Sequence, residues 1–311
     1  MIAERVAAGV ARRIEDFANA GRHVWNGSDS EAIHDVRVAA RRLIATLRSW
    51  ESLLDEDGRR LALRALKRVR RRLGVTRELE VHIALLESRL RQHGELTHAA
   101  AAVLLVRMKD RLERRHARAA KRLRPKRLKR MVSTLEAAVA PLRDRIVADA
   151  SALEQARGHE RRLGVAAREA LRSARKQTDD PTLHQARIAI KKWRYALEAI
   201  EEAAPGTLPN PVAELRELQA VLGNAHDATT MSEVLERSAR RLEAEHDHVA
   251  LQPLIDTLEA ERSRAVEDFQ RLAEALLARP DLTSVPAPTA PEPSWPSDEK
   301  ERMARWLTGR R

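Results

Sequence analysis

The chain has 311 residues, a formal net charge of +12 at pH 7 and no cysteine. The lack of cysteine excludes disulfides, thiolate catalysis and cysteine-ligated metal sites, and the positive charge favours polyanionic partners such as nucleic acid, anionic membranes or inorganic polyphosphate. The N-terminus lacks the apolar segment of a signal peptide, and the longest fully apolar run, residues 99–106, is too short to span a membrane. We therefore expect a cytoplasmic protein that does not insert into membranes.

The composition predicts an all-α fold. There are only 11 glycines, and Ala, Leu, Arg and Glu, which all favour helices, dominate the sequence. Clusters of Gly, Pro, Asp and Asn mark the expected breaks between helices, at residues 19–30, 54–58, 91–98, 124–126, 178–181, 204–211 and 279–297. The last cluster is rich in proline and indicates an extended linker.

An internal repeat organises the chain. The segment "HDVRVAARRLIATLRSW" (34–50) returns as "HQARIAIKKWRYALEAI" (184–200), and residues 63–78 and 112–119 match residues 212–227 and 258–265 in the same order. The repeat predicts one domain made of two homologous halves, each a bundle of about four helices, that face each other across a pseudo-two-fold axis.

The expected boundaries follow from this repeat. The first half spans residues 1–146 and the second spans 147–280, and together they form the single domain 1–280. Residues 281–311 are expected to be the Pro-rich linker and a C-terminal tail.

Each copy of the repeated segment carries a basic row beside an apolar stripe. His34, Arg37 and Arg41 are spaced three or four residues apart and share a helix face, while Trp50 lies on the apolar stripe, as Trp193 does in the second copy. Like charges spaced in this way repel, so an external anion or acids from other helices must neutralise the row. Arginine offers forked donors that match phosphate oxygens. A solvated basic surface is the alternative interpretation.

We expect the polyanion to be bound by basic side chains and one tyrosine from both halves. Their positions are His34, Arg37, Arg41, Arg42, Arg48, Lys67 and Arg118 in the first half, and His184, Arg187, Lys191, Lys192, Arg194, Tyr195, Arg216 and Arg264 in the second.

The Leu-Gly pairs at 73–74 and 222–223 are expected to serve packing or helix-end geometry. Glu78 and Asp227 follow these pairs, and we expect them to cap a helix or to hold a basic residue.

Four segments, "HDVRVAARRL", "LGVTRELEV", "HQARIAIKKWRYALE" and "LQAVLGNAHD", stand in an order that resembles the CHAD family, the conserved histidine α-helical domain. The resemblance covers about residues 1–280 and implies two four-helix bundles around a central basic pore or cleft. It also implies that inorganic polyphosphate binds there and that some members associate with polyphosphate granules. The residues that would line the site are His34, Arg37, Arg41, His184, Arg187 and Lys191. Glu78 stands where the family more often has Asp.

The function expected from the sequence is non-enzymatic binding of long-chain polyphosphate, without cofactor or metal. Nucleic-acid binding is the alternative, which the charge permits but which the aromatic content of 3% does not favour. A metal-dependent polyphosphate hydrolase is a second alternative with weaker support. The E-x-E-x-K signature of the triphosphate tunnel enzymes is absent, and residues 246–248 (HDH) are the one short candidate metal motif.

Overall fold

The computed structural model describes residues 2–27, 31–91, 93–140, 149–209, 211–240 and 245–283. Every regular element in these ranges is helical, which confirms the all-α prediction. The first-half helices are α1 (Ile2–Asn26), α2 (Ala32–Ser49), the 3-10 helix η1 (Glu51–Leu53), α3 (Glu56–Leu90), α4 (Glu95–Arg122) and α5 (Pro125–Val139). The second-half helices are α6 (Asp149–Lys176), α7 (Asp180–Ala203), α8 (Val212–Ala239), α9 (Glu245–Leu277) and the short α10 (Pro280–Thr283).

The order of the long helices is the same in both parts of the chain. Helices α2, α3 and α4 carry the repeated segments of the first half, and α7, α8 and α9 carry those of the second. The expected boundary at residues 146 and 147 and most of the expected tail, residues 284–311, lie outside the described residues. The pseudo-two-fold axis remains a prediction.

Two helices begin at acidic caps within the expected breaks. The Asp55 carboxylate accepts a hydrogen bond of 2.8 Å from the backbone N–H of Gly58 at the start of α3. The Asp179 carboxylate accepts one of 2.8 Å from the N–H of Thr182 at the start of α7. These bonds satisfy backbone donors that the first turn of a helix leaves unpaired.

The break expected at residues 19–30 starts later than predicted, because α1 continues to Asn26. Gly21, part of that expected break, lies inside the helix, and a Cβ atom there would fall 2.8 Å from Cδ1 of Leu128. This glycine therefore serves close packing of α1 against α5, and it does not end the helix.

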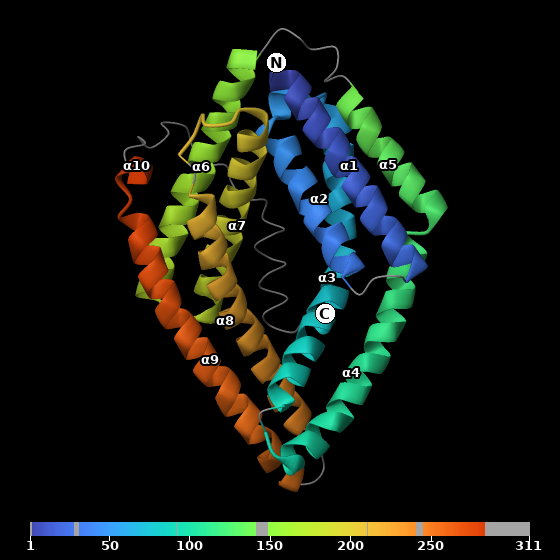
Figure 1. Ribbon diagram of the computed structural model, residues 1–311, viewed down its shortest axis with the longest axis vertical. Coiled ribbons are helices and arrows are strands. Elements are labelled where there is room, and N and C mark those ends of the chain that lie inside the picture. Colours follow the sequence, from blue (N-terminus) through green and yellow to red (C-terminus); the bar gives the residue numbers. More distant parts are fainter. Residues whose placement is uncertain are drawn as a thin grey trace.

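Three hydrophobic cores hold the helices together. The first lies mainly among α1, α2, α3 and α5, and the second among α6, α7, α8 and α9. The third joins the C-terminal part of α3 and the N-terminal part of α4 to α8 and α9. In Figure 1 this third core lies at the lower end of the molecule, where the two helix pairs converge. The two halves are thus fastened by a core that neither has alone.

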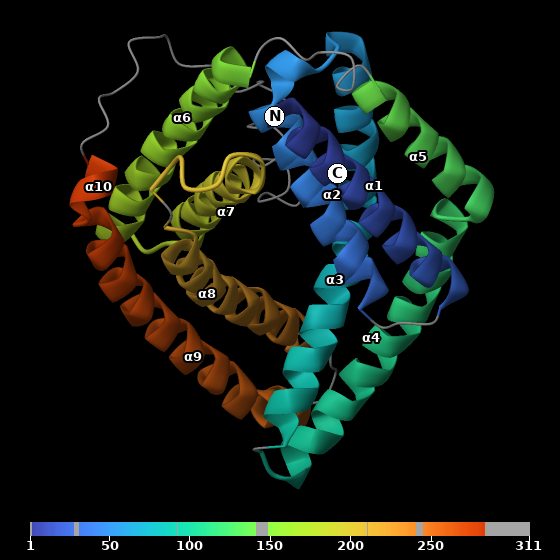
Figure 2. The ribbon, with the colours of Figure 1, turned by 45° about the horizontal axis from the view of Figure 1, so that its top comes forward.

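Helices α2 and α7 form a second junction between the halves. They pack against each other, as Figure 2 shows from another direction. The indole N–H of Trp50, at the end of α2, donates a hydrogen bond of 3.2 Å to the carbonyl oxygen of Ala199 in α7. Trp50 and Trp193 are both buried, in agreement with their expected core positions. This junction brings the two basic rows close together.

None of the helices in the described ranges is sufficiently long and apolar to cross a membrane.

The third core should contribute strongly to stability. Leu235 of α8 is fully buried there, so we expect Leu235→Ala to lower the free energy of unfolding by about 2–5 kcal/mol through lost burial and the remaining cavity. Urea denaturation followed by circular dichroism measures this change. The exposed neighbour Glu233 provides the control, because Glu233→Ala should cost about 0.5 kcal/mol or less. Equal small effects of both substitutions would contradict the role of this core.

Candidate polyanion-binding site

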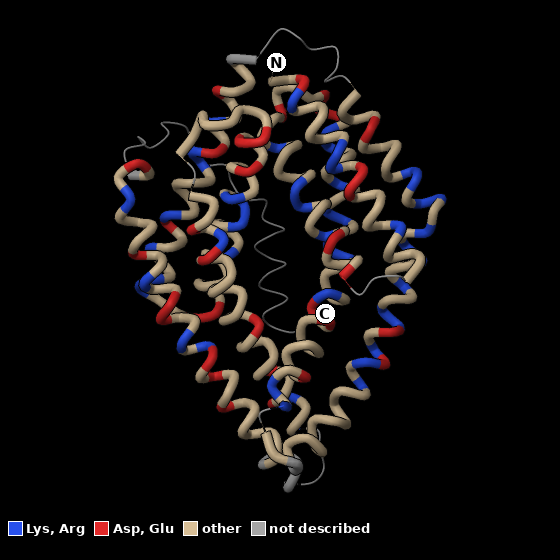
Figure 3. The backbone as a smooth tube through the Cα atoms, in the orientation of Figure 1, with Lys and Arg blue, Asp and Glu red and all other residues tan. Residues whose placement is uncertain are grey.

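Five basic side chains from three helices meet at the junction of the two halves. Burial and, to a smaller extent, the positive charges of Arg187, Arg41, Arg37 and Arg70 together lower the pKa of Lys191 to about 6. We call these five residues the central basic cluster. Figure 3 shows Lys and Arg, in blue, on stretches of α2 and α7 beside the centre of the molecule. The expected neutralisation by acids from other helices is incomplete here, because a lysine surrounded by acids would keep its charge.

Arg37 is held in place by α3. Its Nη1 group donates a hydrogen bond of 2.6 Å to the carbonyl oxygen of Arg70. Burial, together with Arg41, Arg70 and Arg77, lowers the pKa of Arg37 to about 10. Burial makes the charged form of Arg37 less favourable, and the neighbouring positive charges make it less favourable still.

The two repeated glycines both lie beside arginines of the cluster, and the approach is tight at Gly74. A Cβ atom at Gly74 would lie 3.2 Å from Nη1 of Arg37, and one at Gly223 would lie 3.8 Å from Nη2 of Arg187. Both glycines stand well inside helices α3 and α8, so the expectation of helix-end geometry is wrong and the packing alternative is correct.

Three polar atoms of the site have no hydrogen-bond partner in the described part of the chain. They are Nε of Arg41, Nε of Arg187 and Nδ1 of His184, and all three atoms are buried. Buried polar atoms in folded proteins are almost always paired. These three atoms leave hydrogen-bonding capacity beside one cluster of cations, which is where a ligand could use it.

Tyr195 supports the cluster through its ring. The guanidinium carbon of Arg41 lies 6.0 Å from the ring centroid, and that of Arg194 lies 4.2 Å away. The tyrosine is buried, with 7% of its surface exposed. Its ring therefore helps to hold Arg41 of α2 beside α7 through a cation–π contact.

Two carboxylates lie close to the cluster. Burial raises the pKa of Asp227, while Arg187, Lys191 and Arg77 act in the opposite direction. Partial removal from water and the charge of Asp227 both raise the pKa of Glu78. Glu78 and Asp227 stand inside α3 and α8, so they do not cap helices. Their position near basic residues agrees with the other expectation, that they hold a basic residue. Two carboxylates are nevertheless fewer than the five basic side chains of the cluster.

Histidines from both halves border the cluster. Burial and the nearby arginines Arg77 and Arg41 lower the pKa of His34. Burial, Arg187 and Lys191 lower that of His184, whose ring lies 5.0 Å from the ring of His226. Lowered pKa values keep these imidazoles neutral near pH 7, so they offer hydrogen bonds without adding charge.

Other predicted site residues lie away from this cluster. Arg194 and Arg216 both bind the Glu198 carboxylate, at 2.6 and 2.9 Å. Arg48 lies near His159 of α6, whose pKa its charge helps to lower. These arginines are therefore engaged with other parts of the protein.

The remaining predicted residues are dispersed over the surface. Arg42 is exposed near Arg13 of α1, and Lys192 is half-buried on α7. Lys67 is exposed and lines a surface hollow on α3. Arg118 and Arg264 are exposed on α4 and α9. No described contact connects Arg118 or Arg264 with the cluster.

The structure adds residues that sequence reasoning missed. Arg70 and Arg77 of α3 flank Gly74 at spacings of four and three residues, which places them on the face that Arg37 crosses. Arg77 aligns with His226 in the repeat, so both halves place a basic or imidazole side chain there. The spacing of Arg70 and Arg77 around the repeated Gly74 is the sequence signal that could have identified these two arginines.

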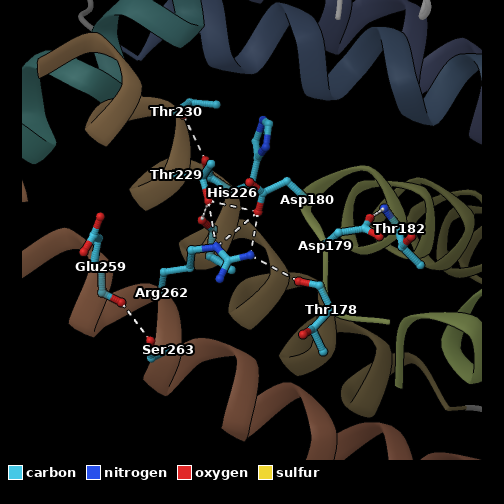
Figure 4. Close-up of polar contacts among 11 residues, drawn as sticks. Thr178, Asp179, Asp180, Thr182, His226, Thr229, Thr230, Glu259, Arg262 and Ser263 are labelled. Carbon is cyan, nitrogen blue, oxygen red and sulfur yellow. Dashed lines mark hydrogen bonds and ion pairs between the residues drawn. The ribbon is translucent and has the colours of Figure 1, made fainter. Parts of the chain in front are cut away.

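Arg262 of α9 fixes the start of α7, as Figure 4 shows. It donates hydrogen bonds to the Asp180 carboxylate at 2.9 Å, to the carbonyl oxygen of Thr178 at 3.1 Å and to the Thr229 hydroxyl at 3.2 Å. His184 follows Asp180 by one helical turn. Arg262 is thus a positioning residue for the beginning of the second basic row.

Comparison with known proteins identifies the family. A model of the CHAD domain matches residues 8–236. The chain belongs to the CHAD domain family. This confirms the resemblance that the repeated histidine and arginine segments indicate.

Two solved structures share the fold of this CHAD protein. PptA from Streptomyces chartreusis is 22% identical with a TM-score of 0.66, and the match covers 88% of this chain and 99% of that one. The crystal structure of the CHAD domain from the plant Ricinus communis is 21% identical with a TM-score of 0.66, covering 88% and 92%. No curated protein matches the sequence.

The described residues contain no group of three or more His, Asp or Glu side chains that could hold a metal ion. The side chains of residues 246–248, the candidate metal motif, lie outside the described residues.

Anion binding to this CHAD domain should be linked to proton uptake. Because the pKa of Lys191 is about 6, the lysine is mostly neutral above that pH in the free protein, and a bound anion will raise its pKa. The affinity for tripolyphosphate should therefore rise as the pH falls towards 6, by at most about tenfold per pH unit for each linked proton. Protonation of His34, His184, Glu78 and Asp227 acts in the same direction. Calorimetry in buffers of different ionisation enthalpy measures the protons taken up.

The control for this experiment is Lys191→Arg. Arginine keeps its charge, so this variant should take up about one proton fewer and show a shallower pH dependence. Equal proton uptake by both proteins would contradict the assignment to Lys191.

Loss of the Arg262 side chain should loosen the start of α7. Arg262→Ala removes bonds to three residues, and we expect a loss of about 1–3 kcal/mol in stability and faster hydrogen exchange at the first turns of α7. Hydrogen exchange followed by mass spectrometry measures this local opening. Arg271, exposed on the same helix, provides the control as Arg271→Ala. Unchanged exchange at the start of α7 would show that Arg262 does not fix it.

Proposed function

We propose that this CHAD domain binds inorganic polyphosphate through the central basic cluster, without catalysing a reaction. The observation that carries the proposal is the convergence of Arg37, Arg41, Arg70, Arg187 and Lys191 around buried donors that lack partners. Their mutual repulsion is relieved by a ligand that brings several negative charges to one place. Burial strengthens the attraction because water screens it less.

The chemistry of the cluster favours phosphate oxygens. Arginine presents forked N–H donors that match a phosphate group, and lysine adds a point charge. Arg37 and Arg41 stand on successive turns of α2, as Arg187 and Lys191 do on α7. Successive helical turns are about 5.4 Å apart, so each row offers repeated binding positions along an extended chain of phosphates.

The central test replaces four cations of the cluster. The variant Arg37→Ala, Arg41→Ala, Arg187→Ala, Lys191→Ala should bind long-chain polyphosphate at least about 100-fold more weakly, because charge-assisted hydrogen bonds contribute about 1.5–3 kcal/mol each. Its thermal stability should be unchanged or higher, since repelling buried charges are removed. Titration calorimetry and thermal unfolding measure these two quantities.

A matched control removes the same charge elsewhere. Arg22, Arg172 and Arg271 are exposed on α1, α6 and α9, and Arg240 is exposed directly after α8. Their joint replacement by Ala should leave the affinity within a few-fold of the parent protein. An unchanged affinity in the cluster variant, or an equal loss in both variants, would overturn the proposed site.

The same proteins discriminate between the alternative functions. Competition with single-stranded and duplex DNA at fixed salt should leave polyphosphate bound, because the cluster lacks the exposed aromatic surface on which bases stack. Incubation with polyphosphate and Mg²⁺ or Mn²⁺ should release no phosphate, since phosphoryl transfer needs a metal-holding or nucleophilic group that the proposal does not assign. Displacement by DNA or release of phosphate would favour the corresponding alternative.

Association with polyphosphate granules follows from the same site. In cells that form granules, a fluorescent fusion of the parent protein should gather on them, and the cluster variant should stay diffuse.

A further inference from the structure

A second basic row begins beside the central basic cluster. Arg111, Arg115, Arg118 and Arg122 of α4 are spaced by four, three and four residues, so they share one helix face. We call them the outer row. Arg115 is half-buried and the other three are exposed. Partial removal from water lowers the pKa of Arg115, and the charges of Arg111, Arg118 and Arg122 lower it further.

The side chains of the outer row form no ion pair with an acid in the described part of the chain. None of the hydrogen bonds or ion pairs formed among the described residues includes Arg111, Arg115, Arg118 or Arg122. Acidic side chains of α4 are scarce, since residues 107–130 contain thirteen basic residues against Asp110 and Glu113. Apart from the attraction between Arg111 and Glu78, the row therefore presents positive charge to solvent without an acidic partner among the described residues.

The outer row is connected to the central cluster through Glu78. The charges of Arg37 and of Arg111 both lower the pKa of Glu78, so an arginine of each set lies near this carboxylate. From Arg111 the row extends eleven residues to Arg122, or about 16 Å at the rise of an α-helix. A long polyanion leaving the cluster beside Glu78 can follow it, and a short one cannot span both.

The second half does not repeat this row. In the repeat alignment its counterparts on α9 are Thr257, Glu261, Arg264 and Asp268. Glu261 forms an ion pair with Arg89, and Asp268 forms one with Arg271. The repeat thus has basic residues at the positions of Arg37 and Arg41 in both halves, at Arg187 and Lys191, and an outer basic row in one half only. The two sides of the site differ in charge.

We propose that the outer row binds the same polyphosphate chain as the central cluster and makes the protein selective for long chains. This inference rests on the proposed function. It assigns recognition of a phosphate group to the cluster and recognition of chain length to α4. It also gives the bound chain one preferred direction of exit, along the first half.

The test compares two ligand lengths. In the outer-row variant Arg115→Gln, Arg118→Gln, Arg122→Gln, Arg111 is kept because its charge acts on Glu78. We expect the affinity for long-chain polyphosphate to fall at least about tenfold, with a shallower salt dependence because fewer phosphates are neutralised. The affinity for tripolyphosphate should change less than about twofold. Titration calorimetry at several salt concentrations measures both.

The matched control is Arg172→Gln, Arg240→Gln, Arg271→Gln, which removes three exposed charges elsewhere and should leave both affinities close to those of the parent protein. An unchanged long-chain affinity, an equal loss for both ligands, or a loss of duplex DNA binding without a loss of polyphosphate binding would overturn the inference. If the central-cluster variant still bound tripolyphosphate tightly, the proposed function itself would fail. If the central-cluster variant lost polyphosphate binding while the outer-row variant kept the parent affinity for long-chain polyphosphate, only the chain-length inference would fail.

Discussion

The structure depends on the burial of like charges where its two halves meet. Lys191 is partly removed from water among four arginines, and its pKa falls to about 6 as a consequence. This arrangement destabilises the free protein, since charged groups are normally paired when they are buried. The rest of the fold must therefore supply enough stability to hold the repelling groups together.

That stability comes from apolar packing on either side of the junction. Two cores secure the upper ends of the halves, and a third core joins them at the lower end. Trp50 fastens α2 to α7 through its bond to Ala199. The basic rows thus lie on helices that these cores hold in place, so their donors are already positioned for the anion that we propose. Such preorganisation reduces the entropy lost on binding.

The internal repeat explains why α2 and α7 carry similar basic rows. The residues around the two rows differ. Arg37 and Arg187 cross glycines at equivalent positions, Gly74 and Gly223, so the same local solution is used in each half. Outside the cluster the copies diverge. Arg115 and Arg122 of one half have no acidic partner among the described residues, whereas their counterparts in the other half, Glu261 and Asp268, are acids that form ion pairs. The two basic rows therefore lie in surroundings that differ in charge.

The sequence by itself determined the helical class, the repeat and the residues on each basic face. These follow from composition and from spacings of three and four residues, which depend only on local helix geometry. It also located the buried tryptophans and the family. The sequence could not separate Arg37 and Arg41, which face the other half, from Arg194 and Arg216, which are held by Glu198. That distinction depends on which helices pack together, and so do the roles of Arg70, Arg77 and Arg262. Only the tertiary structure decided them, because contacts between distant segments have no signature in the spacing of either segment.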